Sequence, residues 1–325
     1  MSAIATVAVH SSQFPENVRR DLLKSLRTRK IAHKFHYDSV KQTQKWLALH
    51  RQYSPSRHDD NCRAIYDQSF KTAAAQIKSR QVHLIGLGCG GGQKDTRLLK
   101  LLKASSRQIF YTPSDVSAAM VLTARRAALA VCPEENCFPL VCDLETANDL
   151  PSIFTVSAAR HAHRIITFFG MIPNFEPSLI LPKLASLVRP SDILLFSANL
   201  APGENYGAGT KKILPQYDNA ATRDWLLTFL LDLGVEKREG ELRFEIETKG
   251  GLKRIVANFH FKRSHRVEIE DDAFTFKRGE KVRLFFSCRY TSERVRKILE
   301  AHKLEVCDQW ITPSGEEGVF LCCML

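Results

Sequence analysis

The stretch 82–106, VHLIGLGCGGGQKDTRLLKLLKASS, decides the fold of this chain of 325 residues. It begins with an apolar run typical of a buried strand and continues with five glycines among residues 86–92. It ends in an amphipathic helix with inward-facing leucines at 98, 99, 101 and 102. A strand that passes through a glycine-rich turn into a helix is typical of the first unit of a parallel α/β sheet.

The same alternation continues downstream of this unit. We expect further strands at 108–115, 138–144, 164–172 and 192–200, separated by amphipathic segments that predict helices. Strands that alternate with helices indicate a parallel sheet covered on both faces. The sequence therefore predicts a Rossmann-like α/β domain.

Three other regions complete the expected architecture. Residues 15–80 are predicted to be helical, with a turn at 53–56. The region after a helix at 222–234 alternates with period two and predicts antiparallel strands. At the C-terminus we expect a helix with Ser292 as its N-cap, followed by two strands around the turn 314–315.

Composition points to a globular intracellular protein. The chain is 44% hydrophobic and 25% charged, with a formal net charge of +12. Lysine and arginine are scattered rather than gathered into a nucleic-acid-binding arm, so a solvated basic face is favoured over a nucleic-acid partner. The nine cysteines lack the spacing of metal ligands, so we expect no metal and reduced thiols in a cytoplasmic protein. Neither a signal peptide nor a membrane anchor is expected.

The glycine-rich turn is the first part of a predicted nucleoside site. Gly86, Gly88 and Gly90 would let the backbone turn sharply and approach a ligand, while the following helix presents unpaired N–H groups. A purely structural tight turn is the alternative. Asp115 ends the next strand about 27 residues after Gly88, the place of a carboxylate that accepts hydrogen bonds from both ribose hydroxyls.

Two further residues favour S-adenosylmethionine (SAM) over a nicotinamide cofactor. Asp143 ends the third strand, where an acidic residue commonly contacts the adenine amine in methyltransferases; a structural cap or loop aspartate is the alternative. Lys94 could pair with the methionine carboxylate of the cofactor or could be an exposed first-turn lysine. The two final strands are also usual in methyltransferases and normally absent from dinucleotide-binding dehydrogenases. A nicotinamide cofactor would be served equally by the glycines and Asp115, so it remains the rival.

Several segments resemble one known family, the histidine-specific, SAM-dependent methyltransferases of ergothioneine biosynthesis, together with related fungal N-methyltransferases that act on tryptophan derivatives. The similarity covers most of the chain and is weaker at the N-terminus. The segments that carry it are HYDSVKQTQKWLALHRQYSPSR at 36–57, GLGCGGGQKDTRLL at 86–99, YTPSDVS at 111–117, FFGMIPNF at 168–175, ILPQYDNAAT at 213–222 and KVRLFFSCRYT at 281–291.

The resemblance implies two domains with the substrate between them. A SAM-binding Rossmann-like domain would comprise residues 60–200 and 287–325. A smaller α+β substrate-recognition domain would comprise residues 1–59 and 201–286.

The resemblance also implies roles for individual residues. Tyr37 is similar to a tyrosine beside the cofactor, and Asn174 to an asparagine that binds the substrate carboxylate and amine. Tyr53 and Tyr217 are similar to tyrosines of two substrate-binding turns, and with Asn174 they form the expected catalytic group. Structural alternatives remain, since Tyr37 and Tyr53 could simply pack a domain interface and Asn174 could simply stabilise its turn.

The expected side-chain pocket departs from the family pattern. Members selective for histidine carry a glutamate two positions before a serine, whereas this chain has Phe285 before Ser287. Where the family has a methionine that lines the same pocket, this chain has Ala257. A buried imidazole N–H without an acceptor would cost about 1–3 kcal/mol. An aromatic or apolar side chain is therefore favoured over histidine.

These observations predict a SAM-dependent N-methyltransferase that acts on the α-amino group of an amino acid or amino-acid derivative. Histidine remains an alternative substrate. Three other classes stay open: an RNA or protein methyltransferase, a nicotinamide-dependent oxidoreductase, and a non-catalytic protein that keeps the fold for binding. We expect a monomer with a small-molecule partner.

Overall fold

The computed structural model describes residues 4–325 and divides the chain into two compact units. The first unit contains the chain up to Gln13, Pro55–Leu200 and Tyr290–Leu325, and the second contains Phe14–Ser54 and Ala201–Arg289. Residues 4–13 and 55–59 thus lie in the first unit, although they were predicted in the substrate-recognition domain, and residues 287–289 lie in the second unit, although they were predicted in the SAM-binding domain. Among the described residues, no helix combines the length and apolar character needed to cross a bilayer.

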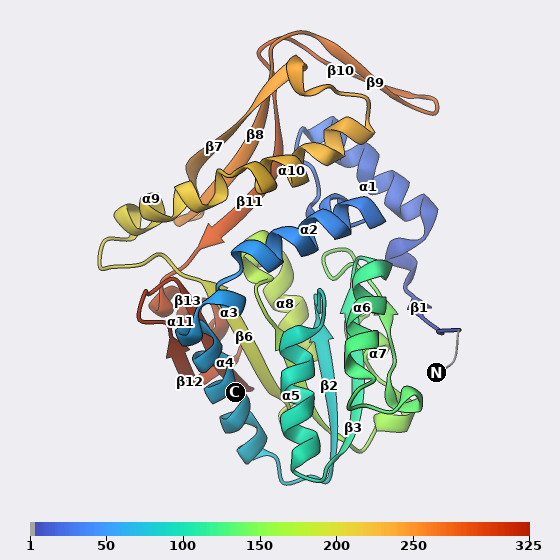
Figure 1. Cartoon of the computed structure of the whole chain (residues 1–325), viewed down its shortest axis with the longest axis vertical. Helices are drawn as coiled ribbons and strands as arrows, with labels where there is room; N and C mark the ends of the chain where they lie inside the picture. Colours follow the sequence, from blue (N-terminus) through green and yellow to red (C-terminus); the bar gives the residue numbers. More distant parts are fainter. Residues whose placement is uncertain (1–3) are drawn as a thin grey trace. The chain divides into compact units, whose positions relative to one another are not determined.

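The first unit is built on a mixed sheet (Figure 1). Within residues 4–325 this sheet has eight strands in the order β1-β4-β3-β2-β5-β6-β13-β12. The strands are β1 Ala8–Val9, β2 Gln81–Leu87, β3 Gln108–Asp115, β4 Leu140–Val141, β5 His163–Phe168, β6 Ile193–Asn199, β12 Leu304–Ile311 and β13 Glu317–Met324. β1 to β6 pair in parallel, while β13 pairs antiparallel with β6 and with β12. The predicted Rossmann-like α/β class is confirmed.

Helices accompany the parallel strands of this unit. The helices are α3 Pro55–His58, α4 Asp60–Gln76, α5 Gln93–Ala104, α6 Ala118–Ala128, α7 Leu150–Ile153, α8 Pro177–Leu187 and α11 Ser292–Glu300, with 3-10 turns η1 Ser11–Gln13, η3 Glu134–Asn136, η4 Ser157–Ala159 and η5 Ile172–Asn174. The inward leucines Leu98, Leu99 and Leu102 of α5 are fully buried against β2 and β3. Burial of each such side chain stabilises the fold by about 1.5–3 kcal/mol.

The second unit packs helices against a small antiparallel sheet. In the described part of the chain this sheet has three strands, in the order β11-β8-β7, and a separate hairpin pairs β9 with β10. The elements are α1 Pro15–Thr28, η2 His33–His36, α2 Val40–Tyr53, α9 Tyr206–Tyr217, α10 Ala220–Asp232, η6 Lys237–Glu239, β7 Gly240–Lys249, β8 Leu252–Phe261, β9 His265–Ile269, β10 Asp272–Phe276 and β11 Lys281–Arg289. Phenylalanines and Trp225 fill its core.

Three local predictions differ from the structure. The strand expected at 138–144 is only Leu140–Val141, because the chain after it turns at Asp143. Helix α9 was missed because it contains two glycines and a proline, which disfavour helix. Its Gly209 is needed, since a Cβ there would lie 2.2 Å from the Pro202 carbonyl oxygen. Thr291 rather than Ser292 caps α11, and its side chain accepts the Arg294 N–H at 3.2 Å.

Candidate functional site

The glycine-rich turn leaves β2 at the carboxyl edge of the parallel strands. Gly88, Gly90 and Gly92 all have positive φ, at 62°, 52° and 71°, a conformation that other residues adopt at a cost. Space is restricted as well: a Cβ at Gly88 would lie 2.2 Å from Met171 Sδ, and one at Gly86 would lie 2.1 Å from Asp95 Oδ2. Glycine is thus required both by conformation and by close packing.

Asp115 faces this turn from the end of β3. One carboxylate oxygen accepts the Gly90 N–H at 3.0 Å, and the other accepts the Ser117 N–H at 3.0 Å. Burial raises the pKa of Asp115 to about 6, and these backbone hydrogen bonds oppose that shift. A carboxylate has about four acceptor sites, so beside the N–H groups of Gly90, Val116 and Ser117 it keeps capacity for a hydroxyl group.

Asp95, which is not among the predicted site residues, is a buried carboxylate beside the glycine-rich turn. Asp95, in the first turn of α5, accepts hydrogen bonds from Tyr111 Oη and Thr167 Oγ1, each at 2.8 Å. Burial raises its pKa to about 6, opposed by the two hydroxyl donors. The cluster connects α5 with β3 and β5 directly under Gly86. Its one sequence signal was an acidic residue three positions after Gly92, which is common in a first helical turn.

Lys94 is held by groups of the first unit. Its Nζ lies 2.7 Å from Tyr66 Oη and 3.8 Å from Glu317 Oε1, and 4.1 Å from the centre of the Tyr66 ring. Tyr66 Oη also donates to the Glu317 carboxylate and lies 3.0 Å from Ser197 Oγ. A methionine carboxylate would therefore have to share Lys94 with this network, and the expected cofactor contact stays a prediction.

Asp143 caps the turn that follows β4. Its Oδ1 accepts the Glu145 N–H at 2.9 Å, and its Oδ2 accepts the Thr146 hydroxyl at 2.9 Å. The side chain is 7% exposed. The geometry is that of a structural loop aspartate, and the adenine contact stays a prediction. Asn174 ends η5, just after β5, and is partly exposed at the same edge of the sheet.

In the second unit, three predicted residues come together with one that was missed. Tyr217 Oη lies 2.8 Å from Ser287 Oγ and accepts a hydrogen bond from Arg289 Nη2 at 2.7 Å. Because the guanidinium can only donate, the tyrosine proton is free to point to Ser287. Ser287 and Arg289 are 1% and 5% exposed. Arg289 could have been found from the period of two along β11, which places it on the same side as Phe285 and Ser287.

Phe285 lies in an aromatic cluster beside this polar group. Its ring centre is 5.5 Å from that of His33 and 6.0 Å from those of Tyr217 and Trp225. Tyr37 joins the cluster through a hydrogen bond of 2.9 Å between its hydroxyl and His33 Nε2, and its ring centre is 5.5 Å from that of Trp225.

His33 and its neighbour His36, whose ring centre is 5.5 Å from that of Trp225, are both uncharged at neutral pH. Burial lowers the pKa of His33 to about 3, with a smaller contribution from His36. Burial also lowers the pKa of His36 to about 4, opposed by its 2.5 Å hydrogen bond to the Leu284 carbonyl oxygen. The cluster around Phe285 is thus aromatic and neutral.

Two further predicted substrate residues lie on β8 and α2. Ala257 is fully buried on β8, directly opposite Phe285 in the ladder, so the two side chains share one face of the sheet. Tyr53 ends α2 and is 48% exposed. The expected role of Tyr53 in substrate binding rests on the resemblance alone.

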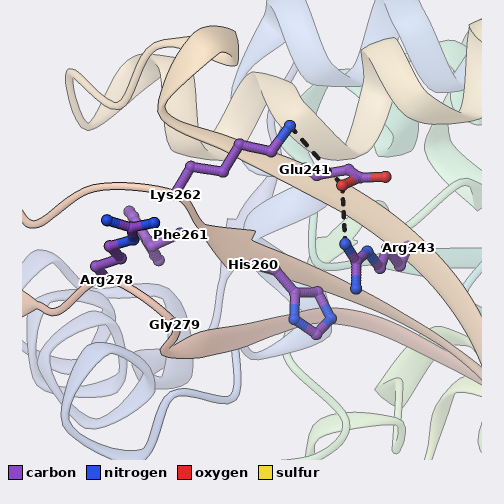
Figure 2. A pocket seen from close by; sticks show the side chains of 7 residues that line it. All are labelled: Glu241, Arg243, His260, Phe261, Lys262, Arg278 and Gly279. Atoms are coloured by element: carbon purple, nitrogen blue, oxygen red, sulfur yellow. Dashed lines mark hydrogen bonds and ion pairs between the residues drawn. The ribbon is translucent and has the colours of Figure 1, made fainter.

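An open pocket of about 410 Å³ lies elsewhere on the second unit (Figure 2). Arg243, His260, Lys262 and Arg278 give it a basic lining, and Glu241 pairs with Arg243 at 3.0 Å and with Lys262 at 3.8 Å. None of the predicted site residues lines it. Among residues 4–325, no group of three or more His, Cys, Asp or Glu side chains could hold a metal ion.

The first unit suits a nucleoside cofactor. The left-handed glycines bring backbone close to the sheet edge, and Asp115 presents a carboxylate with remaining acceptor capacity beside them. This combination is the one that binds ribose hydroxyls in Rossmann-type domains. The parallel strands with the antiparallel pair β13 and β12 define the class as that of SAM-dependent methyltransferases.

Comparison with known proteins is specific about the family. The model of the histidine-specific, SAM-dependent methyltransferase family matches residues 18–324. The chain therefore belongs to this family, and its cofactor is SAM; the nicotinamide alternative is set aside. The match also makes methyl transfer the class of reaction.

Individual relatives are distant. The N-methyltransferase imqF of Aspergillus flavus is 24% identical over 242 residues, which cover 72% of this chain and 66% of that protein, just under two thirds of its length. Among solved structures, a SAM-dependent methyltransferase from Clostridium acetobutylicum has a TM-score of 0.47 at 12% identity, covering 86% of this chain and 98% of its own. Magnesium protoporphyrin IX methyltransferase from Synechocystis has a TM-score of 0.46 at 13% identity, covering 91% and 99%.

Proposed function

We propose that the protein transfers a methyl group from SAM to the α-amino group of an amino acid, or of an amino-acid derivative, with an aromatic or apolar side chain. The observation that carries this substrate class is Phe285, which stands in a neutral aromatic cluster with His33 and Trp225. A buried aromatic wall favours an apolar ring and offers no carboxylate to an imidazole N–H. Similarity to a fungal N-methyltransferase is consistent with nitrogen as the acceptor.

The cofactor, when bound, supplies an electrophilic methyl group on a positively charged sulfur. The protein must then deliver a neutral amine, direct its lone pair to within about 3 Å of the methyl carbon, and exclude water. Asn174 and Tyr53 would bind the carboxylate and amine of the substrate. Tyr217, oriented by Arg289 and Ser287, would contribute a hydroxyl at the substrate's polar end. The amine proton leaves to solvent or to a tyrosine hydroxyl.

A screen tests the proposal directly. Each of the twenty amino acids, and aromatic derivatives that keep a free α-amine, such as tryptophan esters and dipeptides, is incubated with SAM and analysed by mass spectrometry for added methyl groups. We expect methylation of an aromatic or apolar member in preference to histidine. A preference for histidine would support the alternative substrate. Binding of S-adenosylhomocysteine without any methylated amine would favour a non-catalytic binding protein.

Variants at Phe285 test the assignment of the pocket. Phe285→Gln introduces a hydrogen-bond acceptor and should raise kcat/KM for histidine relative to the best aromatic substrate by about tenfold. Phe285→Leu is the matched control, because it removes the ring without adding a polar group and should not improve histidine. Equal selectivity of both variants and the wild type would show that Phe285 does not contact the substrate. Light scattering of the same samples tests the expected monomer.

A further inference from the structure

The N-terminal segment of the chain forms the outer strand of the cofactor sheet. β1 pairs in parallel with β4, since Ala8 N donates to the Pro139 carbonyl at 3.0 Å and His10 N donates to the Val141 carbonyl at 2.9 Å. This pairing continues directly into η1. Residues 10–13 are thereby placed beside the end of β4, where Asp143 follows.

Four residues form a continuous chain of hydrogen bonds at this point. Asp149 Oδ1 lies 3.0 Å from His10 Nε2, and His10 Nδ1 lies 2.9 Å from Ser12 Oγ. The Ser12 N–H also donates to His10 Nδ1 at 3.1 Å, and the Asp143 N–H donates to Ser12 Oγ at 3.0 Å. Because Nδ1 faces a backbone donor, it carries the lone pair, and the ring proton is on Nε2 toward Asp149. Every donor then has an acceptor.

Asp149, His10 and Ser12 follow one another like the acid, base and nucleophile of a serine hydrolase triad. Their environment, however, does not suit hydrolysis. Ser12 is only 6% exposed, and its oxygen already accepts the Asp143 N–H. A catalytic serine needs an accessible oxygen beside a water-free site for the developing negative charge. The chain of bonds therefore holds backbone rather than performing hydrolysis.

We propose that His10 and Ser12 form a latch that sets the position of the Asp143 loop for recognition of the adenine edge of the cofactor. This inference rests on the proposed role of Asp143 in the cofactor site. The Asp143 N–H is bonded to Ser12, while its carboxylate caps the turn through Glu145 and Thr146. Loss of Ser12 Oγ removes this acceptor of the Asp143 N–H, and we expect the peptide and the cap to shift together. His10 and Ser12 are positioning residues, one step removed from the ligand.

Calorimetry with two ligands separates this role from general stabilisation. S-adenosylhomocysteine carries the adenine amine, and S-inosylhomocysteine has a carbonyl oxygen in its place. The wild type should bind S-adenosylhomocysteine more tightly, so the Kd of S-inosylhomocysteine divided by that of S-adenosylhomocysteine should exceed one. Ser12→Ala should reduce this ratio by about tenfold, the effect of about one well-placed hydrogen bond. His10→Ala should act in the same direction. Ser12→Thr, which keeps the hydroxyl, should restore the ratio, and Ser186→Ala, an exposed serine of α8, should leave it unchanged.

Asp143→Asn separates the adenine contact of Asp143 from the positioning role of His10 and Ser12. If this variant keeps the wild-type ratio, the adenine contact of Asp143 is wrong and the proposed cofactor geometry fails at that position. If it loses the ratio while Ser12→Ala and His10→Ala keep it, the latch alone is overturned. A Ser12→Ala protein that binds both ligands equally more weakly, with a lower Tm, also overturns the latch, because that is the effect of a purely structural residue. Faster hydrogen exchange at residues 142–147 in Ser12→Ala would support it.

An independent observation concerns the opposite end of the sheet. Cys307 and Cys323 lie on the antiparallel strands β12 and β13, and their sulfur atoms are 2.9 Å apart. Cys307 is exposed and stands where the strand register shifts between Val306 and Asp308. A disulfide requires the sulfurs to approach by about a further 0.9 Å. Burial, and then the neighbouring Cys307, raises the pKa of the Cys323 thiol to about 12.

We propose that Cys307 and Cys323 form an intramolecular disulfide by exchange with a small disulfide such as oxidised glutathione. The Cys307 thiolate attacks one glutathione sulfur, and the glutathione S–S bond breaks to release one glutathione. The Cys323 thiolate then attacks the Cys307 sulfur and releases the second. Two cysteines are oxidised, one glutathione disulfide is reduced to two thiols, and the two thiol protons end on glutathione.

Mass spectrometry of the native protein tests this modification. Exposure to oxidised glutathione should lower the intact mass by two hydrogens and yield one cross-linked peptide containing both cysteines, which dithiothreitol separates. Cys323→Ser should instead stop at the glutathione adduct on Cys307, and Cys307→Ser should give neither product. A stable glutathione adduct on wild-type Cys307, or no change at all, would overturn the proposal.

Discussion

Replacement of Gly88 by alanine tests the physical requirement of the cofactor turn. Gly88 has φ of 62°, and a left-handed alanine costs about 1–2 kcal/mol. The added Cβ would also lie 2.2 Å from Met171 Sδ, and crowding of this kind typically costs about 1–3 kcal/mol. We therefore expect Gly88→Ala to lower the free energy of unfolding by about 2–5 kcal/mol.

Gly170 offers a matched control within the same unit. It has φ of 68°, and a Cβ there would meet nothing within 4 Å. Gly170→Ala should therefore show the conformational cost alone, about 1–2 kcal/mol. Urea denaturation of both variants gives the difference, and the double variant Gly88→Ala/Met171→Ala should recover only the part that comes from crowding. Calorimetry should show S-adenosylhomocysteine binding weakened at least about tenfold in Gly88→Ala.

Two outcomes would refute this reasoning. Equal destabilisation by Gly88→Ala and Gly170→Ala would show that contact with Met171 contributes nothing. Unchanged affinity of Gly88→Ala for S-adenosylhomocysteine would show that the turn does not determine the geometry of the cofactor site.

Three further predictions concern neighbouring groups. The pKa of Asp115 is raised to about 6, above its ordinary 3.8, so ionisation of this carboxyl group reduces the free energy of unfolding as pH rises from about 4 through 6. Affinity for S-adenosylhomocysteine should in contrast increase over the same range. Asp115→Asn should remove that pH dependence of affinity in calorimetric titrations. Tyr111→Phe removes one of two hydroxyl donors to the buried Asp95 and should lower the free energy of unfolding by about 1–3 kcal/mol in urea; a loss under 0.5 kcal/mol would mean that the bond is dispensable. Asn174→Ala should sharply reduce turnover with unchanged S-adenosylhomocysteine affinity, and full turnover would remove Asn174 from the catalytic group.

Most of the fold could be predicted because its signals are local. The strand 108–115 was predicted with the bounds that the structure shows, since the apolar residues 109–111 and the closing Asp115 are neighbours in the sequence. Elements that depend on distant partners were not predictable in this way. β1 has two exposed residues and forms a strand because it pairs with β4. α9 forms despite its glycines, and its Gly209 is needed because the backbone at Pro202 lies close to it.

The candidate site likewise contains residues with a local sequence signal and residues whose role depends on distant partners. Asp115 was identifiable because a strand, its length and its last residue are all visible in sequence. Asp95 was not, because it looks like an ordinary first-turn acid. The period of two places Arg289 on the same side of β11 as Phe285 and Ser287, but it does not reveal the partner of its guanidinium. Their significance comes from Tyr111, Thr167 and Tyr217, which lie far away in the chain.

By itself, the sequence determined the parallel α/β class, the glycine-rich turn and the carboxylate that follows it, because period, glycine and strand ends are properties of neighbouring residues. Only the tertiary structure decided which donors meet which acceptors. The bonds of Lys94 to Tyr66 and of Ser12 to Asp143 join segments that are 28 and 131 residues apart. Such pairings depend on how strands are ordered in the sheet, and that order is set by packing rather than by any local pattern.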